Sequence, residues 1–467
     1  MTIRALLAQT AGIAADYLEG IPERPVGWST GVDELRASLG GPLPERPADP
    51  GEVIAHLAAA AEPGLVASPG GRYFGFVIGG TLPAALAADW LVSAWDQNAG
   101  LYVCGPSAAV VEEVAGAWTA ELLGLPDGVS FGFVTGCQMA HVTALAAARH
   151  SVFARVGWDV NERGLIGAPP AHVVVGAERH ATIDRALRFL GFGAACLVPV
   201  AADAQGRMVP AALAEELARL DGPTIVCAQA GNVNTGSFDP LEAIADLTEE
   251  AGAWLHVDGA FGLWAAASPA LRHLVAGAAR ADSWATDAHK WLNVPYDSGI
   301  ALCAHPEAQE AAMSVRAGYL MHADADGPRD ELDWNPDFSR RARGFPVYAA
   351  IRSLGRSGVA ELVERCCAHA RRFAEVLAAT PRVEVLNEVV LNQVLVRFLD
   401  VDEGGDHDGY TRAVIDAVQS DGTCWLSGTT WHGMGAMRIS VSSWATTSED
   451  VERSLEAILR AAGEVRR

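Results

Sequence analysis

The sequence decides its fold at Thr286-Asp287-Ala288-His289-Lys290-Trp291, the centre of the region 283–302. The short run 283–286 before it is typical of a buried strand, and a loop rich in turn residues follows it. A lysine is usually a solvated surface cation, but Trp, Ala, Leu and Val flank this one. We expect them to desolvate the ammonium group and lower the pKa of Lys290. Such a lysine can act as a nucleophile that forms a Schiff base.

A second signal lies upstream, in Trp254-Leu255-His256-Val257-Asp258-Gly259-Ala260-Phe261. It is typical of a buried strand that ends in a carboxylate, and open α/β sheets bind ligands at the carboxyl ends of their strands. Asp258 is either the cap of a following helix or the acidic partner of a protonated pyridine nitrogen. Lys290 follows 32 residues later, across one more strand. The pair favours a pyridoxal phosphate site, which combines a Schiff-base lysine with an acidic partner.

These two segments, residues 256–261 and 287–297, resemble the group II pyridoxal-phosphate-dependent amino acid decarboxylases, which act on aromatic amino acids, tyrosine, histidine and glutamate. The resemblance runs from about residue 50 to the end of the chain. It implies the fold type I architecture, an α/β fold with a mainly parallel central sheet, helices on both faces and a small C-terminal α+β domain. It also implies pyridoxal 5'-phosphate as the cofactor, an amino acid as the substrate, and a homodimer with the active site at the subunit interface.

The domain organisation combines this resemblance with the pattern of the sequence. We expect an N-terminal helical segment over 1–60 that packs on the partner subunit, a large cofactor-binding domain over 61–312, a mobile catalytic loop over 313–343 and a small C-terminal domain over 344–467. Strands that alternate with helices from 130 to 303 specify a mainly parallel sheet covered on both faces. In the small domain, strands are expected at 424–427 and 436–441.

The turn Thr135-Gly136 lies between a predicted strand, 130–134, and a helix that begins at Cys137. A glycine turn before a helix offers free N–H groups and the positive end of the helix dipole to a phosphate. The resemblance implies that the cofactor phosphate binds here. Gly136, Cys137 and Gln138 stand where relatives often carry serine, so backbone N–H groups are the expected contacts and the side-chain contacts stay open.

The resemblance implies roles for further residues. His180, at a strand-to-helix junction, is either a cap or a core group or, as the resemblance favours, a ring that stacks on the cofactor and touches the substrate carboxylate. Asn234 or Thr235 either reaches the cofactor or forms only turn hydrogen bonds, and His289 contacts the phosphate or the substrate. Asp287 replaces a common asparagine and, near a phosphate, is either turned away or protonated. The candidate cofactor-binding residues are Lys290, Asp258, Ala260, His180, Gly136, Cys137, Gln138, His289, Asn234 and Thr235.

From residue 314 the sequence becomes polar and aperiodic, which is typical of a loop that closes over an active site. By resemblance, Tyr319 protonates the α-carbon after carbon dioxide leaves, whereas relatives that make aldehydes tend to carry phenylalanine. The candidate catalytic residues are therefore Lys290, Tyr319 and His180, and the chain is interpreted as an amino acid decarboxylase, a carboxy-lyase. An aldehyde synthase, an aminotransferase and a non-enzymatic cofactor-binding protein stay open as alternatives.

The substrate side chain is less well defined by the sequence. Tyr73, Phe74 and Phe76 are candidate pocket residues and suggest an apolar or aromatic substrate, although such aromatic residues more often belong to a core. Arg438 lies in the small domain, where related aminotransferases bind the substrate carboxylate with an arginine. We interpret Arg438 as structural.

Composition limits the partners and the compartment. The net charge of −23 argues against nucleic acid and anionic membranes, which both require basic patches. No apolar run reaches the roughly 20 residues that span a bilayer, and no clear signal cleavage site follows the N-terminus. The eight cysteines show neither CxxC nor zinc-ligand spacing, so they predict reduced thiols, no metal site and a cytoplasmic protein.

Overall fold

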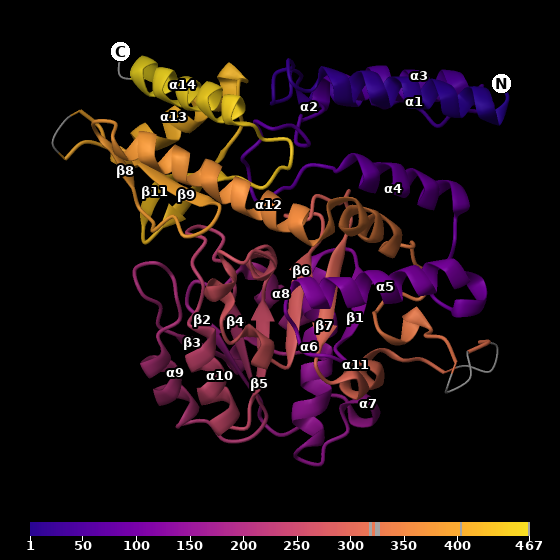
Figure 1. Cartoon of the computed structure of the whole chain (residues 1–467), viewed down its shortest axis with the longest axis vertical. Helices are drawn as coiled ribbons and strands as arrows, with labels where there is room; N and C mark the ends of the chain where they lie inside the picture. Colours follow the sequence, from indigo (N-terminus) through magenta and orange to yellow (C-terminus); the bar gives the residue numbers. More distant parts are fainter. Residues whose placement is uncertain (317–319, 323–326, 402–403, 466–467) are drawn as a thin grey trace.

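Seven strands form the central sheet, in the order β1-β7-β6-β5-β4-β2-β3 (Figure 1). They are β1 (Ser130–Val134), β2 (His172–Gly176), β3 (Leu197–Val200), β4 (Thr224–Gln229), β5 (Trp254–Asp258), β6 (Ser283–Asp287) and β7 (Gly299–Cys303). In this computed structural model, which describes residues 1–316, 320–322, 327–401 and 404–465, the five strands from β6 to β3 are parallel. β7 runs antiparallel to both β6 and β1. The expected mainly parallel sheet is therefore confirmed.

Helices cover both faces of this sheet because its strands are apolar on both sides. Val173 and Val175 of β2 pack in one apolar cluster with Leu145 and Ile183 from the helices, whereas Val174 belongs to the cluster on the opposite face. The helices of this region are α4 (Pro83–Trp95), α5 (Pro106–Leu122), α6 (Cys137–Ala154), α7 (Val160–Arg163), α8 (Ala181–Phe189), α9 (Pro210–Leu217), α10 (Leu241–Glu250) and α11 (Pro306–Met313). Because both faces of the sheet are packed against helices, the carboxyl ends of β5 and β6 are held in place at one edge of the sheet.

A second, antiparallel sheet in the order β10-β11-β9-β8 forms the C-terminal α+β part. Its elements are α12 (Gly344–Ala378), β8 (Val383–Val385), β9 (Gln393–Phe398), α13 (His407–Asp421), β10 (Ser427–Trp431), β11 (Met434–Ser440) and α14 (Ser448–Val465). The prediction of a strand at 424–427 is wrong. Cys424 is buried in the core and Trp425 pairs with Tyr73 in an isolated bridge, so the strand begins only at Ser427.

The N-terminal segment consists of α1 (Ile3–Gly20), α2 (Val32–Leu39) and α3 (Pro50–Ala61). In Figure 1, α1 and α3 lie together at the upper right, beyond α4. No residue of α1 is buried within the described part of the chain. None of the described helices is both long and apolar enough to cross a bilayer. The expected domain boundaries stay predictions, and Tyr319 lies outside the described residues.

Candidate active site

The carboxyl ends of β5 and β6 and two strand-to-helix turns meet at a cavity of about 320 Å³. β5 ends at Asp258, and the turn after β6 carries His289 and Lys290. Eight of the ten candidate cofactor-binding residues line this cavity, namely Lys290, Asp258, Ala260, His180, Gly136, Cys137, Gln138 and His289. Its volume lies in the range of small-molecule sites. Residues that are far apart in the sequence thus form one site.

Lys290 is held by Asp287 in this site. The Nζ atom of Lys290 lies 2.9 Å from Oδ2 of Asp287, and Nε2 of His289 lies 3.4 Å from Oδ1. Asp287 is buried, whereas the side chain of Lys290 is 23% exposed. The carboxylate of Asp287 therefore points at the lysine, and its two alternatives beside a bound phosphate stay predictions.

This ion pair also corrects the expected pKa of Lys290. Burial alone would lower that pKa, as the flanking Trp and Ala residues suggested. The Asp287 carboxylate outweighs burial, so the pKa of Lys290 lies above the usual value for lysine. The sequence showed the apolar flanks, but the turn that brings the carboxylate of Asp287 back onto the ammonium group was overlooked.

The N-terminus of α6 forms the turn at which a phosphate was expected. Gly136 has a φ of 155°, and a Cβ atom there would lie 3.0 Å from Cε1 of His289, so the turn needs glycine. The N–H of Cys137 donates to Oδ1 of Asp287 at 2.6 Å. Gln138 donates through Nε2 to the carbonyl of Thr182 at 3.3 Å, and its buried Oε1 lacks a partner among the described residues. The turn thus commits the N–H of Cys137 to Asp287 and leaves the amide oxygen of Gln138 without a partner among the described residues.

His180 caps α8 and lines the cavity at the same time. Its Nδ1 accepts the N–H of Thr182 at 3.3 Å and lies 2.8 Å from the Thr182 hydroxyl. Burial lowers the pKa of His180, which favours a neutral ring. The capping role is confirmed. The stacking of this ring on a cofactor stays a prediction.

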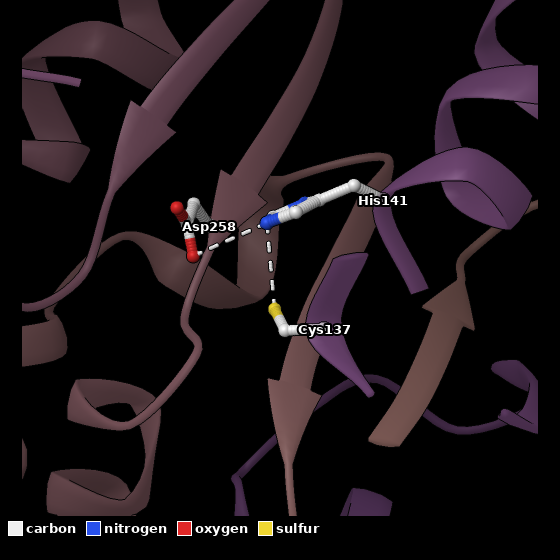
Figure 2. A group of neighbouring side chains, drawn as sticks. All are labelled: Cys137, His141 and Asp258. Carbon is white, nitrogen blue, oxygen red and sulfur yellow. Dashed lines mark hydrogen bonds and ion pairs between the residues drawn. The ribbon is translucent and has the colours of Figure 1, made fainter. Parts of the chain in front are cut away.

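Asp258 has a neighbour that sequence reasoning missed. His141, on α6, places Nε2 3.5 Å from Oδ1 of Asp258 and 3.4 Å from Sγ of Cys137 (Figure 2). Burial acts to raise the pKa of Asp258, but His141 outweighs it and holds that pKa well below its usual range. The i,i+4 spacing of Cys137 and His141 could have indicated that both face the sheet from one side of α6.

Two candidates do not reach the cavity. Thr235 donates to the carbonyl of Gln205 at 2.7 Å, and Asn234 accepts from the hydroxyl of Thr429 at 3.0 Å. Neither residue lines the cavity, because both side chains are engaged by neighbouring chain segments. The alternative of turn and loop hydrogen bonds therefore describes Asn234 and Thr235.

The aromatic candidates also lie elsewhere. Tyr73 is buried and stacks on Trp425 at 5.1 Å between ring centroids, and Phe76 lies 5.7 Å from the same ring. Phe74 is a core residue. Tyr296, which sequence reasoning did not select, lines the cavity with its ring 4.4 Å from that of His289. Among the described residues, the tyrosine that lines the cavity therefore lies in the loop after Lys290.

Arg438 of β11 is buried, and its NH1 donates to the carbonyl of Val233 at 3.3 Å. Val233 itself lines the cavity, but Arg438 does not. Arg438 therefore supports the cavity wall through its hydrogen bond to the backbone of Val233, which agrees with the structural role predicted for it.

The cavity residues fit pyridoxal 5'-phosphate. Lys290 offers an amine for its aldehyde, Asp258 an anion for its ring nitrogen, and His180 a planar ring. The N-terminus of α6 offers N–H groups for its phosphate, and the buried Oε1 of Gln138 leaves a hydrogen-bond acceptor to be satisfied.

Comparison with known proteins leads to the same chemistry. Residues 34–399 match the family described as the pyridoxal-dependent decarboxylase conserved domain. The chain is 26% identical to an aromatic-L-amino-acid decarboxylase of Bacillus atrophaeus, over 99% of this chain and 96% of that protein. It is 30% identical to an L-2,4-diaminobutyrate decarboxylase of Rhizobium meliloti, over 96% of this chain and 85% of that protein.

A solved structure shares the fold. The Oryza sativa protein TDC, crystallised with pyridoxal phosphate and tryptamine, superposes with a TM-score of 0.93 over 100% of this chain and 98% of that one, at 24% identity. The fold type I architecture inferred from the sequence is thereby confirmed.

Proposed function

The chain belongs to the pyridoxal-dependent decarboxylase family, and from that membership and the site we propose that it converts an L-amino acid into its amine and carbon dioxide at Lys290. The cofactor is pyridoxal 5'-phosphate, and the enzyme is a carboxy-lyase that acts on amino acids. One observation supports the proposal above all others: Lys290, Asp258 and His180 line a single cavity.

The residues of this chain divide the work. When bound, the cofactor supplies an electron-withdrawing ring that accepts the electron pair left by carbon dioxide. Lys290 binds it covalently through Nζ, and Asp258 holds the ring nitrogen protonated. His180 orients the ring, and the N-terminus of α6 binds the phosphate through N–H groups. Tyr319 then delivers a proton to the α-carbon, a role assigned from its sequence context alone.

We assign an apolar or aromatic side chain to the substrate. Apart from the residues given to the cofactor, the cavity wall includes Val77, Val233, Phe261 and Tyr296. Val77, Val233 and Phe261 suit an apolar or aromatic side chain, whereas the same wall also carries the polar groups of Thr135, Thr182, Gln229 and Asp287.

A homodimer is the assembly that we propose. α1 buries none of its residues within the described chain, yet it carries apolar side chains such as Leu7, 56% exposed. Leu57 of α3 and Trp90 of α4 are exposed as well. A groove of about 800 Å³ lies between α1, α4 and the segment 444–453. A second copy that covers these helices would bury this apolar surface.

The cytoplasm is the proposed location, because all eight cysteines are free and most of them are buried. Free thiols in this number suit a reducing compartment.

The test is a product screen of the cofactor-loaded protein. Each common amino acid, with aromatic and diamino analogues, is incubated with the enzyme, and mass spectrometry identifies amines, aldehydes and keto acids. An amine from an apolar or aromatic substrate supports the proposal. An aldehyde with peroxide indicates an aldehyde synthase, a keto acid indicates an aminotransferase, and no product from any substrate contradicts catalysis.

A further inference from the structure

Behind Asp258, four buried side chains form a continuous hydrogen-bonded series. Nε1 of Trp254 donates to Oγ of Ser283 at 2.9 Å, and that Oγ lies 3.0 Å from Nδ1 of His256. Nε2 of His256 lies 2.9 Å from Nδ1 of His141, whose Nε2 faces Asp258 (Figure 2). All four side chains are fully buried. We call Trp254, Ser283, His256 and His141 the relay.

The indole N–H of Trp254 can only donate, so it occupies one lone pair of Oγ of Ser283. Ser283 accepts that hydrogen bond with Oγ and has its own hydroxyl hydrogen left for Nδ1 of His256. Burial, with His141 beside it, lowers the pKa of His256 to about 3. The ring of His256 is therefore neutral and carries a single N–H. When the Ser283 hydroxyl donates to Nδ1 of His256, the N–H of His256 lies on Nε2 and can donate to Nδ1 of His141, which leaves Nε2 of His141 to donate toward Asp258.

The two oxygens of Asp258 have different surroundings. Oδ1 lies 3.5 Å from Nε2 of His141 and accepts the N–H of Ala260 at 3.1 Å. No donor to Oδ2 is present among the residues that the structure describes. Sγ of Cys137 also lies near Nε2 of His141, but burial raises the pKa of Cys137, so it is a thiol and does not replace the carboxylate as an anion. Oδ2 is thereby left for a ligand in the cavity.

We propose that His141 is a positioning residue: the relay holds a proton on its Nε2 toward Oδ1 of Asp258 and leaves Oδ2 to pair with the ring nitrogen of the cofactor. This inference rests on the proposed function in one respect, namely that the ring nitrogen of the cofactor takes part in decarboxylation. His180 and Lys290 line the cavity beside Asp258, and His141 approaches from α6. Cys227 of β4 and the buried Asp239 also interact with Asp258 electrostatically. Asp258 would thus be held from behind by the relay.

The relay can be tested with pyridoxal 5'-phosphate labelled with ¹⁵N in its ring. The holoenzyme is titrated between pH 6 and 10, and the ¹⁵N chemical shift reports protonation of the ring nitrogen. In His141→Asn the amide cannot reach the position of Nε2, whereas in His141→Gln it can. We expect His141→Asn to lower the midpoint of the ring-nitrogen titration by about one pH unit or more, the scale of a lost hydrogen bond to a charged group. His141→Gln should restore most of it.

Two further variants separate the relay from general damage to the fold. Ser283→Ala breaks the series one residue before His256, and we expect a smaller shift in the same direction. Thr143→Val changes a buried residue of α6 whose hydroxyl donates to the carbonyl of Met139, and it should leave the titration unchanged. If His141→Asn does not fold, Ser283→Ala decides the question.

An unchanged ring-nitrogen titration in His141→Asn and Ser283→Ala, with cofactor bound, would overturn the proposal. Zinc that is retained by the wild-type protein and lost in His141→Asn would overturn it too, since a metal ligand needs a lone pair at Nε2. A different result would contradict the proposed function alone: the wild-type holoenzyme would have a protonated ring nitrogen but would release no amine from any amino acid.

Discussion

Asp287 connects Lys290 to the N-terminus of α6: its Oδ2 lies 2.9 Å from Nζ of Lys290, and its Oδ1 accepts the N–H of Cys137 at 2.6 Å. The carboxylate thus takes one of the N–H groups at the phosphate turn and keeps the lysine amine protonated. Both effects oppose capture of the cofactor. We therefore expect Asp287 to set the pH at which the free enzyme takes up pyridoxal phosphate.

We expect Asp287→Asn to capture the cofactor at lower pH than the wild-type protein. Only the neutral amine attacks the aldehyde, so the wild-type capture rate should rise with pH toward the raised pKa of Lys290. Asparagine still accepts the N–H of Cys137 but carries no charge, so the rise should begin at lower pH. At neutral pH the variant should react roughly tenfold faster for each unit by which the pKa falls. Stopped-flow absorbance of apoenzyme mixed with cofactor measures the rate.

Asp297→Asn is the matched control, because Asp297 lies on the same loop but pairs with Arg343 at 2.7 Å. It should leave the pH profile of capture unchanged. Identical profiles for the wild-type protein and Asp287→Asn would show that the 2.9 Å contact does not set the pKa of Lys290.

Lys290→Ala should abolish amine formation, by about four orders of magnitude or more, since such losses follow removal of a covalent catalyst. Lys290→Arg keeps a cation beside Asp287 but offers no nucleophilic amine, so it should be equally inactive. Initial rates with the best substrate measure the loss. Thermal unfolding of both apoproteins checks that the fold is intact. Activity near the wild-type rate in either variant would disprove the role of Lys290.

The strands that build the site follow directly from the sequence. β1 and β5 begin and end at the predicted residues, because apolar runs bounded by turn residues specify strands buried on both faces. α13 was missed although its buried residues, Thr411, Val414, Ile415 and Val418, recur at the i, i+3, i+4, i+7 spacing of an amphipathic helix. This face packs on β9, β11 and α14.

Two residues of the site could be predicted from the sequence because their chemical types suit the roles of the Schiff-base lysine and its acidic partner. Lys290 and Asp258 lie at strand ends, and parallel strands bring such ends together. His141 was missed because its contact with Asp258 depends on how α6 lies across the sheet. Asn234 and Thr235 were placed by resemblance, but Thr429 and Gln205, far away in the sequence, engage their side chains.

Tyr319→Phe should reduce amine formation and release aldehyde instead. Without the phenol, proton transfer to the α-carbon slows, and general acid catalysis typically contributes about 10²–10⁴-fold. Molecular oxygen can then oxidise the decarboxylated substrate before its α-carbon is protonated. That reaction yields aldehyde, ammonia and peroxide. A coupled peroxide assay alongside amine detection measures the partition. An unchanged ratio of amine to aldehyde would assign the proton transfer to another residue.

Leu7→Glu combined with Leu57→Glu should convert a dimer into a monomer. Both side chains are about half exposed on α1 and α3, and carboxylates there would be desolvated in a subunit interface. Light scattering after size exclusion gives the mass. Ile166→Glu is the control, because Ile166 is 95% exposed in the segment before β2 and belongs to neither helix. A wild-type protein that is monomeric at micromolar concentration would contradict the dimer.

The buried pair of Arg340 and Glu112 should carry a large stability penalty when it is broken. Their side chains are fully buried 2.8 Å apart, and Arg340 also donates to the carbonyls of Ala99 and Phe133, each at 2.7 Å. Arg340→Met removes the cation that lies 2.8 Å from the Glu112 carboxylate and leaves Glu112 beside the buried Glu331 and the charge of Arg329. The free energy of unfolding should therefore fall by about 3–5 kcal/mol.

The double variant Glu112→Leu with Arg340→Met removes both charges, and it should recover part of that loss, because an apolar pair needs no partner charge. The two carbonyls left without a donor should prevent full recovery. Urea denaturation of the wild-type protein, both single variants and the double variant measures the coupling of the two residues. If the double variant is less stable than Arg340→Met by the full effect of Glu112→Leu, the two residues act independently and the 2.8 Å contact does not stabilise the fold.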